Sequence, residues 1–403
     1  MLGWLKTRRE VAKFCVDLPF DLSAPAFIAD PYPSYAWLRE NAPAVELQGG
    51  GYLLTRYADI RAAFTNSALG NAPSRFSTLA PRNAQKYVAA DLASHIPPFL
   101  DAPEHKQMRQ MVSRSFFNVF NGMGNELDVL AREQIAQLNA GDDLISAASQ
   151  PFSVIAMCRF CGVASAPEQM KAFTQAFFHL FAPLCDPEVF AQVNTALAAF
   201  RAVLAEALQA GPPEGSLLAQ MRAFQAQSEG ITDVQIVDNC LLVFADGVEN
   251  IEAGVASLML VFEQAGIWDD LQSGTLSMEL AVREGLRLQT PAQLVPRVAR
   301  EGIELGGVQI KKDMPVFLAL ASGNRDGAVF DAPDTFDAAR NMSDVMTFGQ
   351  GRHRCIGETL GIAQLTAMMR AIVELGIRPA AKAMTYQSRI GHRWPDEMFV
   401  KIK

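Results

Sequence analysis

Cys355, in the segment FGQGRHRCIG, is the residue whose surroundings most clearly suggest chemistry. Gly349, Gly351 and Gly357 surround it, and glycine lets a backbone pass close to a flat ligand or adopt a positive φ. The residues that follow have the pattern of an amphipathic helix, so we expect the thiol to lie at a helix N-terminus, where its pKa is lowered. A thiolate in that position could ligate iron. The cysteine alone leaves a second interpretation open, a buried structural residue in a glycine-rich turn.

Two pairs of charged residues have spacings that place their members on one face of a helix. Glu284 and Arg287 stand three apart in MELAVREGLRLQTP, in a helix that Pro291 should end. His105 and Arg109 stand four apart in DAPEHKQMRQMVSRSFF, where they would give a helix a cationic side that can meet carboxylates. Taken alone, such pairs are more commonly solvated surface charges, so their meaning depends on the segments around them.

Strand patterns are confined to small parts of the sequence. Residues 30–80 combine a short helical segment, PYPSYAWLREN, with the extended-looking GGGYLLTRY, which predicts a small β-rich subregion. After Pro291, alternation of apolar and polar residues around Gly306 and Gly307 predicts a hairpin or small sheet.

Helical patterns dominate the rest. Residues 104–290 are mainly helical, and the stretch 234–265 is apolar on nearly every face, which predicts a long helix through the core. Residues 340–376 hold the cysteine loop and the helix that follows it. We therefore expect a mainly α fold with small β-sheets, in a single domain spanning 1–403.

Composition narrows the function classes. Half of the 403 residues are apolar, which is enough for a large core, and the net charge of −8 argues against nucleic-acid binding. The N-terminal MLGWLKTRREVAKFCVDLPF is too short in apolar residues for a membrane anchor. The six cysteines are few and scattered, which favours a reducing compartment, the cytoplasm by default. They are Cys15, Cys158, Cys161, Cys185, Cys240 and Cys355.

The loop FGxGxHxCxG resembles the ligand loop of the cytochrome P450 family. The matching residues are Phe348, Gly349, Gly351, His353, Cys355 and Gly357. The resemblance implies the family's fold, a triangular helical prism that holds haem b between a long distal helix and the proximal cysteine loop with its following helix. It also implies Cys355 as the axial thiolate ligand of the haem iron, which favours O–O cleavage. His353 would then lie near a haem propionate, and Phe348, Gly349 and Gly357 would contact the cofactor.

Further segments extend the resemblance over most of the chain. Glu284 and Arg287 match the family's Glu-x-x-Arg pair, and GNRDGAVFDAPDTFDAARN resembles the segment that supplies a third member, here Arg340. In the family this trio is structural. His105, Arg109 and Arg297 match basic residues that bind the propionates, which implies charge-assisted bonds to two otherwise costly buried carboxylates.

FADGVENIEAG resembles the family's segment over the distal face of the haem, with one departure that bears on catalysis. Gly247 matches a glycine that allows a locally widened groove in the helix, and Glu249 matches an acid. Together with Asp246 and Asn250 they are the expected catalytic residues. Asn250 stands where most members have a threonine whose hydroxyl helps deliver protons, and asparagine is a poor proton relay. An ordered water or the substrate would then do the shuttling.

Asp246 stands where alanine or glycine is usual, four residues before Asn250 and on the same helical face. It could hold a cationic or hydrogen-bonding substrate. We favour the structural alternative, in which a neighbouring side chain caps it or its alignment with the family segment is shifted.

Apolar residues predict the nature of the substrate pocket. The expected pocket residues are Phe177, Phe178, Phe244, Leu294, Val295 and Ile390, which favour an apolar substrate.

We expect no attached redox domain, so electrons from NAD(P)H should arrive through a ferredoxin reductase and a ferredoxin. Exposed basic residues near the cysteine loop would receive the ferredoxin, namely Lys106, Arg114, Arg352 and Arg354.

The leading hypothesis is a monomeric haem monooxygenase of secondary metabolism that hydroxylates a small molecule. One alternative is oxidative coupling or cyclisation without oxygen insertion. The other is a non-catalytic haem protein that recruits a partner enzyme.

Overall fold

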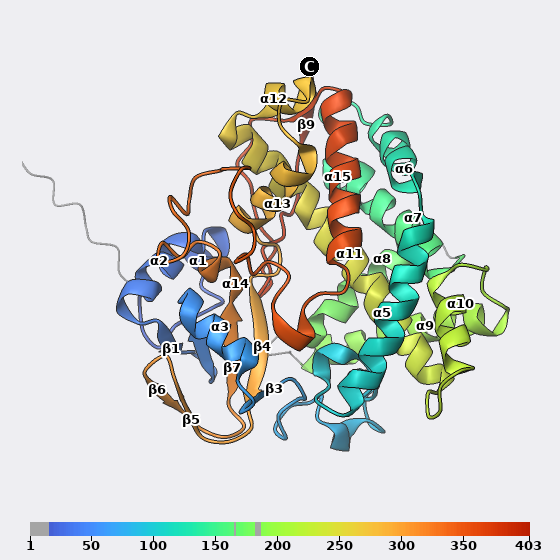
Figure 1. The fold of residues 1–403 in the computed structure, drawn as a ribbon, viewed down its shortest axis with the longest axis vertical. Helices are drawn as coiled ribbons and strands as arrows, with labels where there is room; N and C mark the ends of the chain where they lie inside the picture. Colours follow the sequence, from blue (N-terminus) through green and yellow to red (C-terminus); the bar gives the residue numbers. More distant parts are fainter. Residues whose placement is uncertain (1–15, 165–166, 182–186) are drawn as a thin grey trace, which may run out of the picture.

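Helices carry most of the regular structure in the computed structural model, which describes residues 16–164, 167–181 and 187–403. This confirms the predicted mainly α architecture with small sheets (Figure 1). The α-helices are α1 (Pro25–Ala29), α2 (Tyr32–Asn41), α3 (Tyr57–Thr65), α4 (Val88–Ala93), α5 (Glu104–Gly122), α6 (Glu126–Ile135), α7 (Gln150–Cys161), α8 (Pro167–Phe177), α9 (Pro187–Gln209), α10 (Leu217–Gln225), α11 (Asp233–Ala265), α12 (Trp268–Ser273), α13 (Met278–Leu288), α14 (Leu320–Gly323) and α15 (Glu358–Glu374). Cys15 and Cys185 lie outside the described residues.

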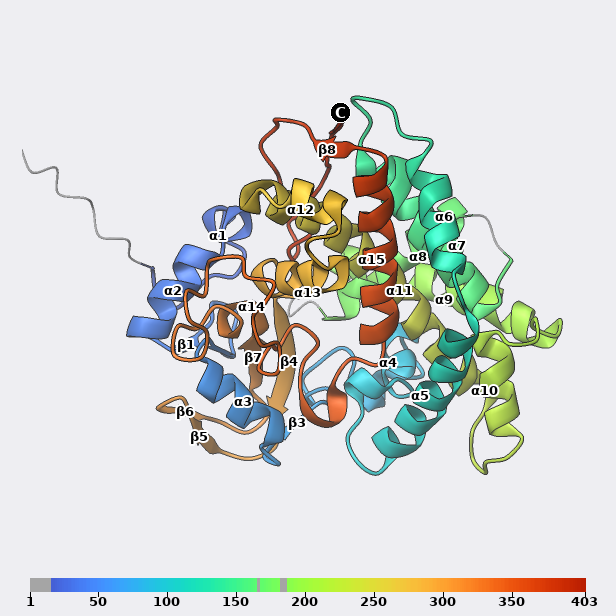
Figure 2. The same cartoon turned by 45° about the horizontal axis from the view of Figure 1, so that its top comes forward.

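The long helix α11 runs through the centre and packs against α7, α8, α9, α13 and α15 (Figure 2). Its start is set by a capping box: the Thr232 hydroxyl accepts from the Gln235 N–H at 3.3 Å, and the Gln235 side chain accepts from the Thr232 N–H at 2.9 Å. It ends at Gly266, whose φ of 66° is left-handed. Within the described residues, the search for a helix with the length and apolarity of a membrane span finds none.

A five-stranded sheet lies beside the N-terminal helices, on the left in Figure 1. Its strand order is β1 (Ala44–Glu46), β2 (Tyr52–Leu54), β7 (Pro315–Ala319), β4 (Leu294–Ala299) and β3 (Leu69–Gly70). Only β2 and β7 pair in parallel. The predicted hairpin is formed by β5 (Ile303–Leu305) and β6 (Val308–Ile310), and Gly306 and Gly307 make its turn with φ of 61° and 81°. A separate pair joins β8 (Ile377–Pro379) to β9 (Val400–Ile402).

Close helix packing brings the cysteine loop next to α11. A Cβ added to Gly254 of α11 would lie 2.9 Å from a methyl carbon of Leu365 on α15, so these helices approach closely. Because α15 begins three residues after Cys355, this contact places the loop before it beside the middle of α11. The edge of β4 and the first turns of α5 complete the surroundings of the loop.

Candidate functional site

A cavity lies between α11, α5, β4 and the cysteine loop. From the loop its walls include Phe348, Gly349, His353, Cys355, Ile356 and Gly357. From α11 they include Leu242, Val243, Asp246, Gly247, Asn250 and Ile251. The cavity therefore has one wall carrying a thiol and a facing wall carrying a carboxylate and an amide.

Backbone conformation turns the Cys355 thiol into the cavity. Gly349 and Gly351 have φ of 68° and 72°, which other residue types rarely adopt, and the Cys355 N–H donates to the Phe348 carbonyl at 2.9 Å. Cys355 is solvent-accessible yet surrounded by protein, because its accessible surface faces the cavity.

The pKa of the Cys355 thiol differs from the sequence expectation. Burial and the negative charge of Asp246 raise this pKa to about 12, although the Gly357 N–H and Arg109 oppose the change. The expected lowering by the helix terminus is therefore wrong, since desolvation outweighs it. A cation bound to the sulfur is needed to hold it as a thiolate.

Asp246 and Asn250 lie one helical turn apart on the face of α11 that lines the cavity. Burial raises the pKa of the Asp246 carboxyl to about 7. Among the described residues, no hydrogen bond or ion pair reaches this carboxylate, and the buried Asn250 Oδ1 has no partner. The favoured expectation that a neighbouring side chain caps Asp246 is thus not what the described residues show.

Gly247 also lines the cavity, but α11 continues through it without interruption. A Cβ at this position would lie 2.4 Å from the Met157 sulfur on α7. The close approach of α7, rather than a widened helix, is the structural reason for glycine at this position.

Glu249 points away from the cavity, toward α8. It is 3% exposed and accepts from Lys171 Nζ at 2.9 Å and from the Thr174 hydroxyl at 2.6 Å. Lys171 also pairs with Glu252, whose pKa is raised by burial. The sequence reasoning placed Glu249 with the catalytic residues and missed Lys171, whose 78-residue separation from Glu249 leaves no local signal.

Basic side chains gather at one edge of the cavity. We name His105, Arg109, Arg297 and His353 the basic cluster. The rings of His105 and His353 have centroids 4.1 Å apart, and the other two residues line the cavity. The buried His105 Nε2 has no hydrogen-bond partner among the described residues.

The charges of the basic cluster have little compensation. Burial lowers the pKa of Arg297 to about 10, and burial with the neighbouring His105 and Arg297 lowers that of His353 to about 3. Asp101, the nearby carboxylate, is already paired with Arg300. The cluster is therefore suited to receive anionic groups from a ligand.

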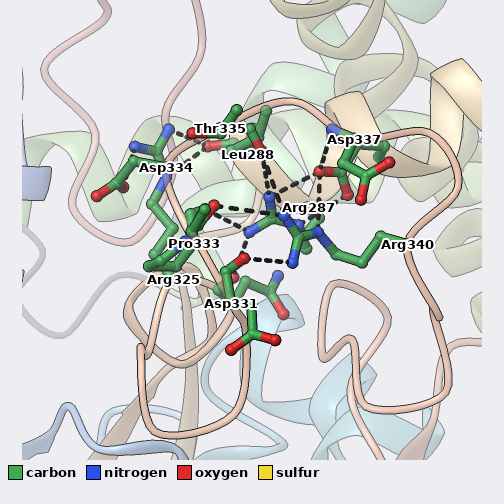
Figure 3. Close-up of polar contacts among 12 residues, drawn as sticks. Arg287, Leu288, Arg325, Asp331, Pro333, Asp334, Thr335, Asp337 and Arg340 are labelled. Carbon is green, nitrogen blue, oxygen red and sulfur yellow. Dashed lines mark hydrogen bonds and ion pairs between the residues drawn. The ribbon is translucent and has the colours of Figure 1, made fainter.

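Glu284, Arg287 and Arg340 form a buried polar cluster, and Figure 3 shows how its two arginines lie. Glu284 and Arg287 are fully buried and joined by two hydrogen bonds of 2.7 and 2.8 Å. Arg287 also donates to the backbone carbonyls of Asn324 and Pro333 at 2.8 and 2.7 Å. The three residues that the sequence grouped are thus brought together in space.

Apolar residues line the rest of the cavity, but not all those expected. Phe178, Leu294, Val295 and Ile390 line it, as does Phe181. Phe116 and His392 also line it, although sequence reasoning assigned them no such place. Phe177 and Phe244 are fully buried and do not themselves line the cavity, although Phe177 packs edge-on against Phe178 and Phe181. Phe244 packs edge-on against Phe200 because it sits about 200° around α11 from Asp246.

Comparison with known proteins identifies chains that are similar to this one. A family model described as Cytochrome P450 matches residues 261–375. The chain is 29% identical to "Cytochrome P450 BJ-3" of Bradyrhizobium diazoefficiens, covering 90% of this chain and 91% of that one. It is 27% identical to "Nocardicin C N-oxygenase" of Nocardia uniformis, covering 85% and 86%. The solved structure of CalO2 superposes with a TM-score of 0.85 at 24% identity, over 95% of this chain and 98% of that one.

This chain matches cytochromes P450 in all three comparisons. It is accordingly an oxidoreductase of the haem-dependent monooxygenase type.

The residues present fit the haem that a cytochrome P450 carries. A flat cofactor needs close backbone approach, which Gly349 and Gly357 provide in the cavity wall. Its propionates need cations and hydrogen-bond donors, which the two arginines and the two histidines of the basic cluster offer. His105 Nε2, which has no partner among the described residues, is available to bond one of them. The iron needs an axial ligand, and Cys355 is the thiol in that wall.

Proposed function

We propose that this cytochrome P450 is a haem-thiolate monooxygenase that inserts one atom of O2 into a small, largely apolar organic molecule. When bound, haem b would be held by the Cys355 thiolate and would supply the oxygen activation. The observation that carries the proposal is the cavity itself, which has Cys355 on one wall, Asp246 and Asn250 on the other, and the basic cluster at its edge.

The chain's own residues have distinct proposed roles. His105, Arg109, Arg297 and His353 would hold the propionates. Phe178, Leu294, Val295 and Ile390 would exclude water and contact the substrate.

Proton handling would fall to the polar face of α11. Because Asn250 is a poor proton relay, Asp246 is the group on that face that can hold and release a proton near neutral pH. Glu249 would act only indirectly, by fixing α8 to α11 through Lys171.

Redox partners are proposed from the exposed basic residues beside the cysteine loop. Lys106 and Arg114 on α5 and Arg352 and Arg354 on the loop are exposed, and an Arg109–Arg354 hydrogen bond of 2.6 Å joins the two elements. We infer that an acidic ferredoxin, reduced by NAD(P)H through its reductase, binds this surface. We also propose a monomer located in the cytoplasm.

Asn250 also favours a second candidate reaction, oxidative coupling or cyclisation without oxygen insertion. The mass of the product separates the two: hydroxylation adds one oxygen, and coupling removes two hydrogens. A haem protein without turnover would support the non-catalytic alternative.

The Cys355→Ala variant tests the proposal. The parent, reduced and treated with CO, should give the red-shifted Soret band of a thiolate-ligated haem, and the variant should lack it. Phe244→Leu, in the core away from the cavity, serves as a control that should keep the band. An unchanged band in Cys355→Ala would refute thiolate ligation by this residue.

A further inference from the structure

The long helix α11 carries four acidic residues in its interior, and three of them pair with a cationic side chain. Asp238 is fully buried and accepts two bonds of 2.6 Å from Arg201. Glu249 and Glu252 share Lys171. Burying a carboxylate costs free energy unless a cation or several hydrogen-bond donors contact it, and each of these three carboxylates has such a contact.

Asp246 is the fourth and differs from the others. Within residues 16–164, 167–181 and 187–403 it has no salt bridge or hydrogen bond, and burial is the dominant influence on its pKa. The two internal segments outside these ranges, 165–166 and 182–186, contain no lysine, arginine or histidine in sequence. Because its exposed surface faces the cavity, a cationic group that enters the cavity can pair with it.

The surroundings of Asp246 indicate what kind of molecule that is. Asn250, one turn further along, also lines the cavity, and among the described residues its buried Oδ1 acceptor has no partner. Phe116, Phe178 and Phe181 line other parts of the same cavity. A ligand that satisfies these groups has a nitrogen rich in N–H donors on an apolar, partly aromatic body.

We propose that Asp246 determines specificity by binding a protonated amine of the substrate, assisted by Asn250. This inference rests on the proposed haem cavity and names the class of molecule that it takes: an apolar amine, positively charged at neutral pH. An alkyl ammonium keeps its charge there, since its pKa is near that of lysine, about 10.4. The carboxylate and the ammonium would each replace the lost hydration of the other.

The experiment measures binding rather than turnover, using the haem-loaded protein. The probes are 4-phenylbutylamine, its N,N-dimethyl derivative and 2-phenylethylamine, each matched with the alcohol of the same carbon skeleton. Dissociation constants are measured by calorimetry at pH 8, where more of Asp246 is ionised, and absorption spectra show whether nitrogen binds the iron. The variants are Asp246→Asn, Asp246→Glu and, as a matched loss of charge outside the cavity, Asp233→Asn on the exposed start of α11.

The parent should bind at least one amine about tenfold or more tightly than its alcohol, as expected for a charge-assisted hydrogen bond. Asp246→Asn should lose this preference while keeping its affinity for the alcohol, whereas Asp246→Glu and Asp233→Asn should retain it. The proposal is overturned if no amine of the set binds the parent more tightly than Asp246→Asn. It is also overturned if the amines bind through the iron with equal affinity in both proteins. A missing thiolate Soret band in the parent would instead refute the proposed function, so the two failures are distinguishable.

Discussion

Replacing Glu284 by glutamine should destabilise the protein far more than the same change at an exposed ion pair. Glu284 is fully buried, and its carboxylate accepts four hydrogen bonds. Three of them reach Oε1, from Arg287, Asp337 N–H and Arg340, and one reaches Oε2 from Arg287. The amide NH2 of glutamine can accept none, so it would face an Arg287 donor.

The magnitude follows from burial. Breaking a buried ion pair leaves an uncompensated charge and costs about 3–5 kcal/mol. A domain has a total stability of about 5–15 kcal/mol, so Glu284→Gln should remove a large part of it. We expect a cost of about 3 kcal/mol, the lower end of the range, because glutamine keeps one accepting oxygen.

Glu374 offers a matched control. It accepts two hydrogen bonds from Arg132, at 2.9 and 3.1 Å, but the two side chains are 48% and 59% exposed. Glu374→Gln should therefore cost less than about 1 kcal/mol. Urea unfolding followed by circular dichroism gives both values. If the two variants lose similar stability, the reasoning from burial is refuted.

Three further perturbations follow from the same contacts. Lys171→Met leaves two buried carboxylates facing each other and should cost about 3–5 kcal/mol at pH 8; because the pKa of Glu252 is raised, the deficit in the urea midpoint should shrink as pH falls toward 6. Asp246→Asn should stabilise the protein increasingly as pH rises from 4 to 7 and level off above, because burial raises the carboxyl pKa from 3.8 to about 7 and the ionised form disfavours folding. Solvent in the cavity limits that gain to about 1 kcal/mol. Gly247→Ala should lower the melting temperature, by a cost of about 1–3 kcal/mol, because the new methyl group displaces Met157.

Each of these has a result that would contradict it. A pH-independent deficit in the lysine variant would show that the carboxylates are not in contact. A loss of stability in Asp246→Asn at pH 8 would reveal a partner for this carboxylate. An unchanged melting temperature in Gly247→Ala would mean that α7 and α11 are less tightly packed.

Much of the fold could be predicted from local patterns in the sequence. The stretch 234–265 is apolar enough to require burial, and the observed helix α11 starts one residue earlier, at Asp233, where Thr232 caps it. The hairpin at Gly306 and Gly307 followed from alternation and from two residues that tolerate positive φ.

The site could be predicted less well from the sequence. Its details depend on the direction in which each helical residue points and on contacts with residues far away in the sequence. Phe244 and Asp246 are two apart on α11, yet one packs into the core and the other lines the cavity. The partner of Glu249 is Lys171 on α8, and no sequence pattern within α11 predicts this contact. The pKa of Cys355 depends on desolvation by the assembled fold, which a helix-terminus argument omits.

The polar cluster of Figure 3 also indicates which nearby positions should tolerate substitution. Arg287 and Arg340 hold the segment 331–335 by its backbone carbonyls, at Asp331, Ala332, Pro333 and Thr335. Every residue type has such a carbonyl, so the arginines do not read side chains there. A library randomised at the exposed positions of this segment should keep the folded state at high frequency, whereas one randomised at the two arginines should not.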